Sequence, residues 1–132
     1  MGWKEEGKVK RILVVDDEVE ICEFLKIFFE ERGYNVTTVQ SGDAALEAIS
    51  KETPHIVLLD IHMPGMDGMT TLKKIKERRP GVKVIMVTAL ETREKIEDAM
   101  RYGADNYITK PLSLEYLEKD VNEKIAHLIE SR

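Results

Sequence analysis

The chain has 132 residues, of which 42% are hydrophobic and 34% are charged, a composition typical of one soluble globular domain and not of a disordered chain. Its net charge of −5 makes the whole domain a poor electrostatic partner for nucleic acid, and its apolar runs are far shorter than the roughly 20 residues that span a bilayer. The single cysteine, Cys22, excludes an internal disulfide and, with no apolar signal segment at the start, favours a cytoplasmic location.

The first third of the chain begins a regular alternation of strands and helices. Residues 1–9 are polar and are predicted to form an N-terminal tail, and residues 10–132 to form one domain. A run of aliphatic residues at 12–15 predicts the first strand. Apolar residues at helical spacing over 19–32 then predict a helix, and Gly33 directly after it is typical of a C-terminal cap.

The middle of the chain continues this alternation. A short strand is predicted at 35–39, and Ser41 is placed to cap the helix that follows it. The third strand is the aliphatic run at 56–59. A loop rich in turn-forming residues follows at 61–68, and a helix then extends to about residue 79.

The last third adds two strands and two helices. The fourth strand is predicted to contain the aliphatic run at 84–87 and to end at Thr88, and a weaker fifth strand is predicted at 106–109. Helical spacing predicts one helix over 92–102 and a final helix that begins near Ser113. Five short strands alternating with five helices favour a parallel sheet with helices on both faces.

Four of the five predicted strands are followed by reactive polar side chains. Asp16 and Asp17 follow the first strand, Asp60 the third, Thr88 the fourth and Lys110 the fifth. Because the carboxyl ends of parallel strands lie at one edge of a sheet, where ligands bind, these side chains should meet there. Any one of them alone would be read as a turn, strand or surface residue, but the agreement of four strand ends favours a common site.

The expected cluster of carboxylates indicates a metal and phosphoryl chemistry. Two negative charges about 4 Å apart repel by around 4 kcal/mol at an effective dielectric near 20, so the cluster needs a cation or must raise the pKa values of its carboxyl groups. Oxygen ligands favour Mg²⁺, Mn²⁺ or Ca²⁺ over zinc. A carboxylate beside such a cation can attack phosphorus and form an aspartyl phosphate.

With these residues in place, the chain resembles the receiver domains of response regulators, of the CheY type. The resemblance extends over about residues 10–129 and implies a flavodoxin-like α/β fold, a doubly wound five-stranded parallel sheet in the order 2-1-3-4-5 with five helices. The matching motifs, which occur in the family's order and spacing, are residues 12–18, 54–68, 87–89 and 103–111.

The resemblance also implies a metal site that holds Mg²⁺, with Mn²⁺ as an alternative. Asp17 is expected to bind the ion directly and Asp16 largely through water, while Asp60 contributes its carboxylate. His62, two residues after Asp60, is expected to contribute its backbone carbonyl, and its side chain is expected to be exposed to solvent.

The phosphoryl site is implied in the same way. Asp60 is the expected phosphoacceptor, and Thr88 and Lys110 are expected to bind the phosphoryl oxygens. Tyr107 resembles the family's switch aromatic, which turns inward as Thr88 moves toward the phosphoryl group. The bond between Lys110 and Pro111 is expected to be cis.

The function implied is that of a switch in two-component signal transduction. A histidine kinase or a phosphotransfer protein would donate the phosphoryl group, and a downstream effector or fused output domain would be contacted through residues 92–129. The domain would catalyse its own phosphorylation and dephosphorylation without being an enzyme that acts on a metabolite. Neither nucleic acid nor membrane is an expected partner, and a homodimer is compatible with the sequence.

Several alternatives remain open at this point. The chain could be the receiver fragment of a longer DNA-binding regulator, or a receiver used for protein interaction without phosphorylation. A Mg²⁺-dependent aspartyl-phosphate phosphatase of the haloacid-dehalogenase type would need Asp-x-Asp after the first strand, whereas residues 16–19 read Asp-Asp-Glu-Val. A flavodoxin-like FMN carrier would need a phosphate-binding loop there, and the acidic residues would repel phosphate.

Three further positions stand out. His55 stands where the family often has Asp, which we interpret as a surface change without catalytic meaning. Leu90, two residues after Thr88, is expected to hinder the attacking water and so to prolong the life of the aspartyl phosphate. The basic residues around 73–79 are interpreted as a solvated helix face.

Overall fold

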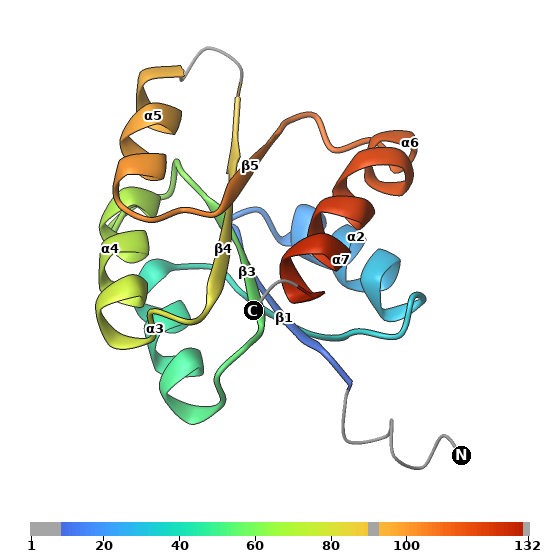
Figure 1. Cartoon of the computed structure of the whole chain (residues 1–132), viewed down its shortest axis with the longest axis horizontal. Helices are drawn as coiled ribbons and strands as arrows, with labels where there is room; N and C mark the ends of the chain where they lie inside the picture. The colour runs from blue at the N-terminus through green and yellow to red at the C-terminus, as the bar shows by residue number, and fades with distance from the viewer. Residues whose placement is uncertain (1–8, 90–92, 131–132) are drawn as a thin grey trace.

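The computed structural model describes residues 9–89 and 93–130, and five parallel strands form its single sheet (Figure 1). The sheet order is β2-β1-β3-β4-β5, as the family resemblance implied. Each predicted strand is present, and the fourth ends at Thr88 as predicted but begins one residue before the aliphatic run, at Lys83. The strands are β1 (Arg11–Val15), β2 (Asn35–Val39), β3 (Ile56–Asp60), β4 (Lys83–Thr88) and β5 (Asn106–Thr109).

Helices connect successive strands and a last helical segment follows β5, as predicted. The helix predicted over 19–32 ends two residues earlier, at Glu30, and the chain turns through Gly33, whose φ of 93° is favourable for glycine. The described part of the helix predicted over 92–102 is Arg93–Arg101, and residue 92 lies outside the described residues. The helices are α2 (Val19–Glu30), α3 (Gly42–Lys51), α4 (Gly68–Arg78), α5 (Arg93–Arg101), α6 (Leu114–Tyr116), η2 (Leu117–Val121) and α7 (Asn122–Glu130).

The last three of these segments follow one another without a break and form one helix with a π-helical turn, η2, inside it. This turn was not predicted, because helical spacing of apolar residues does not distinguish a single π turn from α-helix. Ser113 caps the helix, since its hydroxyl accepts a hydrogen bond of 3.1 Å from the Tyr116 N–H. Ser41 caps α3 in the same way through the Ala44 N–H, as predicted.

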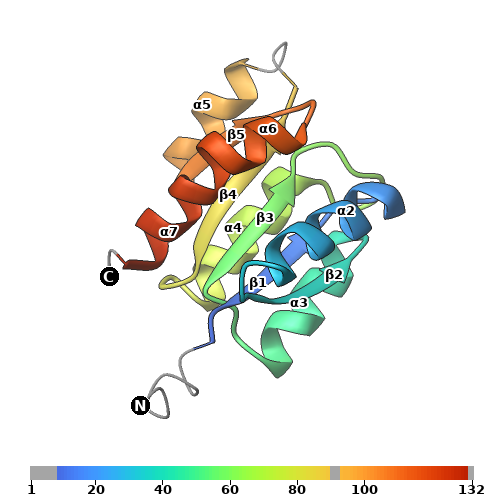
Figure 2. The ribbon, with the colours of Figure 1, turned by 90° about the vertical axis from the view of Figure 1, so that its right-hand side faces the viewer.

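Helices lie on both faces of the sheet (Figure 2), and a hydrophobic core lies between each face and its helices. Ile12 and Val14 of β1 point into the core beneath α2 and the last helix, while Leu13 and Val15 point into the core beneath α3, α4 and α5. Burial on both faces explains why the central strands are continuous aliphatic runs and do not alternate with polar residues. The edge at the carboxyl ends of the strands is left for polar groups.

None of the helices in the described ranges is long and apolar enough to cross a membrane.

Candidate functional site

The carboxyl ends of four strands carry the predicted polar residues to one edge of the sheet. Asp60 and Thr88 are the last residues of β3 and β4, and Asp16 and Lys110 directly follow β1 and β5. Strand β1 pairs with β3, β3 with β4 and β4 with β5, so these four ends are consecutive along the edge. The order of the sheet therefore brings together residues that are far apart in the sequence.

Three carboxylates converge at this edge, as predicted. Asp16, Asp17 and Asp60 each offer an oxygen, and these oxygens all lie within 4.8 Å of one another. Asp16 and Asp60 are buried, with exposed fractions of 2% and 4%, whereas Asp17 is exposed. The cluster is thus open to solvent on one side and buried on the other.

The two oxygens of each buried carboxylate have different partners. One oxygen, Oδ1, accepts a backbone hydrogen bond from the loop that follows: Asp16 from the Glu18 N–H at 2.9 Å, and Asp60 from the His62 N–H at 3.2 Å. The other oxygen, Oδ2, faces the ammonium of Lys110, at 3.4 Å for Asp16 and 3.6 Å for Asp60. One oxygen of each carboxylate therefore orients the loop, and the other points toward the cationic side of the site.

The surroundings of Asp60 favour its protonated form. Its pKa is raised from its usual value of 3.8 to about 6, first because burial penalises the charged form and second because the Asp16 carboxylate lies close by. The ammonium of Lys110 and the His62 N–H act in the opposite direction without cancelling the effect. A carboxylate that is costly to ionise in this way is more basic than usual, and a nearby cation would stabilise it.

Lys110 supplies the positive charge of the site. Burial by itself lowers the pKa of Lys110, but the carboxylates of Asp60, Asp16 and Glu18 outweigh this effect and raise the pKa above its usual value. The Lys110–Pro111 peptide bond is cis, as predicted, and the Lys110 N–H donates a hydrogen bond of 2.8 Å to the Thr88 carbonyl. Lys110 is therefore fully charged at neutral pH and tied to the end of β4.

Thr88 and Tyr107 occupy neighbouring strands. Thr88 is buried, and its hydroxyl donates a hydrogen bond of 3.1 Å to the Ala89 carbonyl. Tyr107 is 39% exposed, and its ring lies 5.6 Å from the ammonium of Lys124 on the last helix. The ring is thus directed outward here, and its predicted inward movement stays a prediction. Leu90 lies outside the described residues.

Two contacts at this edge were not recognised in the sequence. Glu18 lies 3.9 Å from the Lys110 ammonium and adds a third carboxylate to its surroundings. Gly68 begins α4 so close to the Asp60 carbonyl that a Cβ at this position would collide with the backbone. Glycine in a loop after a strand already suggests such a close approach, but the atom approached depends on the tertiary structure.

His55 and His62, the two histidines that flank β3, are placed differently relative to the acidic site. The His62 side chain is exposed, as predicted, beside the loop that follows Asp60. His55 precedes β3 at the opposite edge of the sheet, where its Nδ1 accepts a hydrogen bond of 2.9 Å from the Arg11 N–H. His55 is therefore remote from the carboxylates, but it joins the starts of β1 and β3, a contact that a simple surface position does not make.

The donor set fits a hard divalent cation. The converging ligand atoms are carboxylate oxygens, and the histidine and cysteine side chains of the described residues do not join them. A dication among these carboxylates would reduce their mutual repulsion and the cost of ionising Asp60. The arrangement can then bring a phosphoryl group between a carboxylate, a cation and the Lys110 ammonium.

Comparisons with known proteins agree with this geometry. The family profile described as "Response regulator receiver domain" matches residues 12–122. The transcriptional regulatory protein ZraR of Escherichia coli K12 is 38% identical over 116 residues, which are 88% of this chain and 26% of that protein. The DNA-binding transcriptional regulator NtrC of Klebsiella pneumoniae is 36% identical over 119 residues, or 90% of this chain and 25% of that protein.

Solved structures show the same likeness over nearly the full length of single receiver domains. The receiver domain of NtrX from Brucella abortus has a TM-score of 0.84 and 32% identity, covering 92% of this chain and 99% of that one. A CheY-like receiver domain protein from Methanospirillum hungatei JF-1 has a TM-score of 0.82 and 36% identity, covering 91% and 96%. By contrast, the chain spans only about a quarter of the length of the regulators ZraR and NtrC.

Proposed function

Because the chain belongs to the response regulator receiver domain family and is a receiver of two-component signal transduction, we propose that Asp60 accepts the phosphoryl group. The donor is the phosphohistidine of a histidine kinase or of a phosphotransfer protein. The observation that supports this assignment is the position of Asp60, buried beside two further carboxylates and 3.6 Å from the Lys110 ammonium. The reaction takes place in the cytoplasm, as the sequence led us to expect.

The transfer requires Asp60 in its ionised form. A carboxylate oxygen of Asp60 attacks phosphorus, the new O–P bond forms as the P–N bond to the donor histidine breaks, and the histidine leaves. The Lys110 ammonium faces the Oδ2 atom of Asp60. After the transfer it would stabilise the negative charge on the phosphoryl oxygens. The Thr88 hydroxyl, at the end of the neighbouring strand, would donate a hydrogen bond to another phosphoryl oxygen.

Mg²⁺ is the cation that we propose for the acidic cluster, with Mn²⁺ as a substitute. Asp16, Asp17, Asp60 and the backbone carbonyl of His62 would hold it, and when bound it neutralises charge on the phosphoryl oxygens. Asp16 and Asp60 are already oriented by hydrogen bonds from their own loops, so binding would cost little reorganisation.

The signal leaves the site through the fourth and fifth strands. Thr88 ends β4, and Tyr107 lies in the paired strand β5, with its ring exposed at the face formed by residues 92–129. We expect phosphorylation to draw Thr88 toward Asp60 and Tyr107 inward, which changes this face for a downstream effector or a fused output domain. The domain itself makes no direct contact with nucleic acid in this proposal.

The proposal is tested by the intact mass of the protein after incubation with acetyl phosphate and Mg²⁺. We expect one added phosphoryl group on the native chain and none on Asp60→Asn. Asp67→Asn is the matched control, because it makes the same chemical change in the same loop at a residue that caps α4, and asparagine caps well. A native chain that gains no phosphoryl group at any Mg²⁺ concentration, or an Asp60→Asn chain that gains one as fast, would contradict the proposal.

A further inference from the structure

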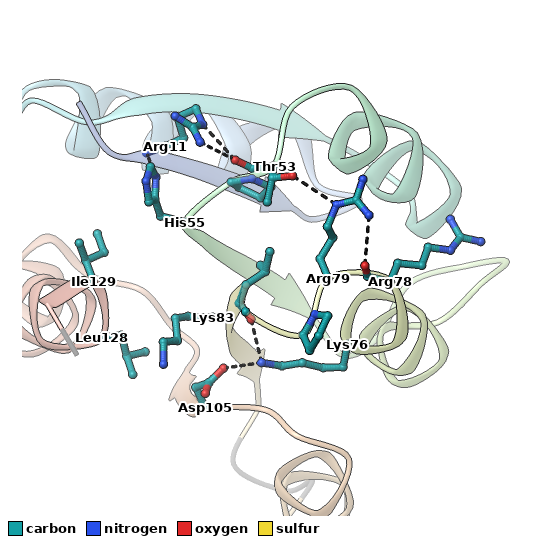
Figure 3. Close-up of a pocket in the computed structure, with 14 residues that line it drawn as sticks. Arg11, Thr53, His55, Lys76, Arg78, Arg79, Lys83, Asp105, Leu128 and Ile129 are labelled. Carbon is teal, nitrogen blue, oxygen red and sulfur yellow. Dashed lines mark hydrogen bonds and ion pairs between the residues drawn. The ribbon is translucent and has the colours of Figure 1, made fainter. Parts of the chain in front are cut away.

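A second pocket lies at the opposite edge of the sheet, at the amino ends of the strands (Figure 3). Its volume is about 620 Å³, within the range of small-molecule sites. Arg11 and Lys83 are the first residues of β1 and β4, and Arg79 directly follows the last residue of α4. The pocket is therefore built by the starts of strands and the ends of α4 and α7, and it shares no residue with the acidic site.

Positive charge dominates the lining of this pocket, although the whole chain carries a net charge of −5. Lys76 and Asp105 neutralise each other at 3.0 Å, and Lys76 also donates to the Val82 carbonyl at 2.7 Å. Asp105 is the one acidic residue of the lining. The four cationic residues that remain after this pair are Arg11, Arg78, Arg79 and Lys83.

Two of these cations converge on one residue. The Arg11 guanidinium donates to the Thr53 carbonyl at 3.0 and 2.7 Å, and the Arg79 guanidinium donates to the Thr53 hydroxyl at 3.3 Å (Figure 3). Glu52 lies 3.7 Å from Arg11, but its own side chain is 69% exposed. Within residues 9–89 and 93–130, Arg79 and Lys83 have no carboxylate within ion-pair distance. Neighbouring guanidinium groups without a shared anion favour phosphate, which both can bind through paired N–H donors.

The remaining wall of the pocket is apolar. Leu128 and Ile129 of α7 face it from one side, and Pro54, Pro80 and Val82 from the loops at the starts of β3 and β4. A ligand that fits this lining has a polyanionic part for the cations and a flat or apolar part for the wall.

We propose that this pocket binds a nucleoside polyphosphate, with its phosphates at Arg79 and Arg11 and its base against the apolar wall, beside which Lys83 adds a further positive charge to the pocket. The binding site is separate from the proposed phosphorylation site and does not depend on it. In the sequence, Arg79 belonged to a basic cluster interpreted as a solvated helix face. In the fold, its side chain bends toward Thr53 and the pocket.

The test is a calorimetric titration of the whole chain with ATP in the presence of EDTA, which keeps metal-bound nucleotide away from the acidic cluster. We expect one ATP per chain, weaker binding of pyrophosphate and no measurable binding of adenosine. Arg79→Glu and Lys83→Glu, studied separately so that the misfolding of one leaves the other informative, should each weaken ATP binding at least tenfold.

Lys119→Glu is the matched control, since it makes the same change of charge at a lysine on the last helix that is 75% exposed and lies outside the pocket. It should bind ATP within about twofold of the native chain. Circular dichroism and phosphorylation by acetyl phosphate should be unchanged in all three variants. The proposal is overturned if folded pocket variants bind ATP as the native chain does, if Lys119→Glu weakens binding equally, if adenosine binds as tightly, or if a glutamate-rich peptide binds and ATP does not.

Discussion

Asp60 is held in an environment that opposes its own ionisation. Burial and the Asp16 carboxylate raise its pKa to about 6, and Lys110 compensates only in part. A cation beside Asp60 would lower the cost of ionising it, and in the proposed function the same cation would assist phosphoryl transfer. Binding of a cation therefore explains why the three carboxylates lie together, whereas a purely structural role does not.

This environment predicts that Asp60 destabilises the metal-free fold at neutral pH. Because the folded-state pKa is above the usual 3.8, the folded chain binds a proton more tightly than the unfolded chain between about pH 4 and 6, and stability falls as pH rises through this window. In EDTA at pH 8, Asp60→Asn should raise the free energy of unfolding by roughly 1–3 kcal/mol. Urea unfolding at pH 8 and pH 4 measures the difference, which should shrink at the lower pH.

The control for this prediction is Asp67→Asn. The pKa of Asp67 is lowered, chiefly by the hydrogen bond from the Thr70 N–H, so loss of its charge should not stabilise the fold at any pH. An equal gain in both variants would show that the effect is a general relief of negative charge and not a property of Asp60.

We expect Lys110 to contribute both to the stability of the fold and to the rate of phosphorylation. Lys110→Met removes the ammonium that faces Asp16 and Asp60, so two buried carboxylates lose their cation. We expect the free energy of unfolding in EDTA to fall by roughly 1–3 kcal/mol. Phosphorylation by acetyl phosphate should be at least tenfold slower. Lys119→Met, at a lysine that pairs only with the exposed Glu115 among the described residues, should change neither rate nor stability appreciably. Equal behaviour of the two variants would exclude the assigned role.

The convergence of the site residues could be predicted from the sequence, but the contacts of their individual oxygen atoms could not. Asp16, Asp17, Asp60, Thr88 and Lys110 follow from their places at strand ends. Oδ1 of Asp60 accepts a hydrogen bond from the loop, whereas Oδ2 faces Lys110. This arrangement depends on the turn after β3, which the sequence predicts only as a loop. A raised pKa in the acidic cluster could be predicted from the mutual repulsion of its carboxylates, but its position at Asp60 depends on burial, which is a property of the assembled edge.

At the scale of elements, the last helix contacts β5, the edge strand through which we propose that the signal passes. The Tyr116 hydroxyl accepts a hydrogen bond of 3.1 Å from the Thr109 N–H, and the Lys124 ammonium donates one of 3.1 Å to the Tyr107 carbonyl. These contacts satisfy backbone groups on the open side of β5, which would otherwise be free for pairing with another strand. They also join the last helix to the residue that precedes Lys110.

Tyr116→Phe should therefore loosen β5 without disturbing the core. The unfolding free energy should fall by about 1 kcal/mol for the lost hydrogen bond, and amide hydrogen exchange at Thr109 should quicken more than at Val57 in the central strand. Tyr34→Phe is the control, because Tyr34 packs against the same core and makes no side-chain hydrogen bond to the described residues. Slower or unchanged exchange at Thr109 in Tyr116→Phe would contradict this role.

The strands could be predicted closely, because the chain has five aliphatic or β-branched runs that are bounded by turn-forming residues. Helix ends could be predicted from Gly33, Ser41 and Ser113, which are residue types that cap helices. The π turn over Leu117–Val121 could not be predicted. Leu117 and Val121 are both fully buried, four residues apart, and α-helical spacing would have satisfied the same pattern. Such a turn depends on how the helix packs against the sheet, and this packing cannot be predicted from the spacing of apolar residues in one segment.

At the scale of the whole molecule, the two edges of the sheet carry opposite charge. The carboxyl edge gathers Asp16, Asp17 and Asp60, and the amino edge gathers the cations around Arg79. The net charge of −5 hides this separation, because it describes the whole chain and neither edge by itself. One end of the molecule is suited to a cation and the other to an anion.

The acidic edge predicts that Mg²⁺ stabilises the folded chain. Binding to the folded state alone should raise the melting temperature with increasing Mg²⁺, by several degrees at concentrations far above the dissociation constant. The same ionic strength supplied as KCl should have a smaller effect, and Asp17→Asn should abolish most of the difference. Equal melting in Mg²⁺ and in EDTA would count against a metal site formed in advance.

The central claim is that Asp60, and no other residue of the acidic edge, carries the phosphoryl group. Borohydride reduces an aspartyl phosphate to homoserine, so peptide sequencing by mass spectrometry after reaction with acetyl phosphate and Mg²⁺ locates the modified residue directly. We predict homoserine at position 60 alone. Homoserine at Asp16 or Asp17, or a phosphoryl group retained on His62 with Asp60 unmodified, would contradict the assignment.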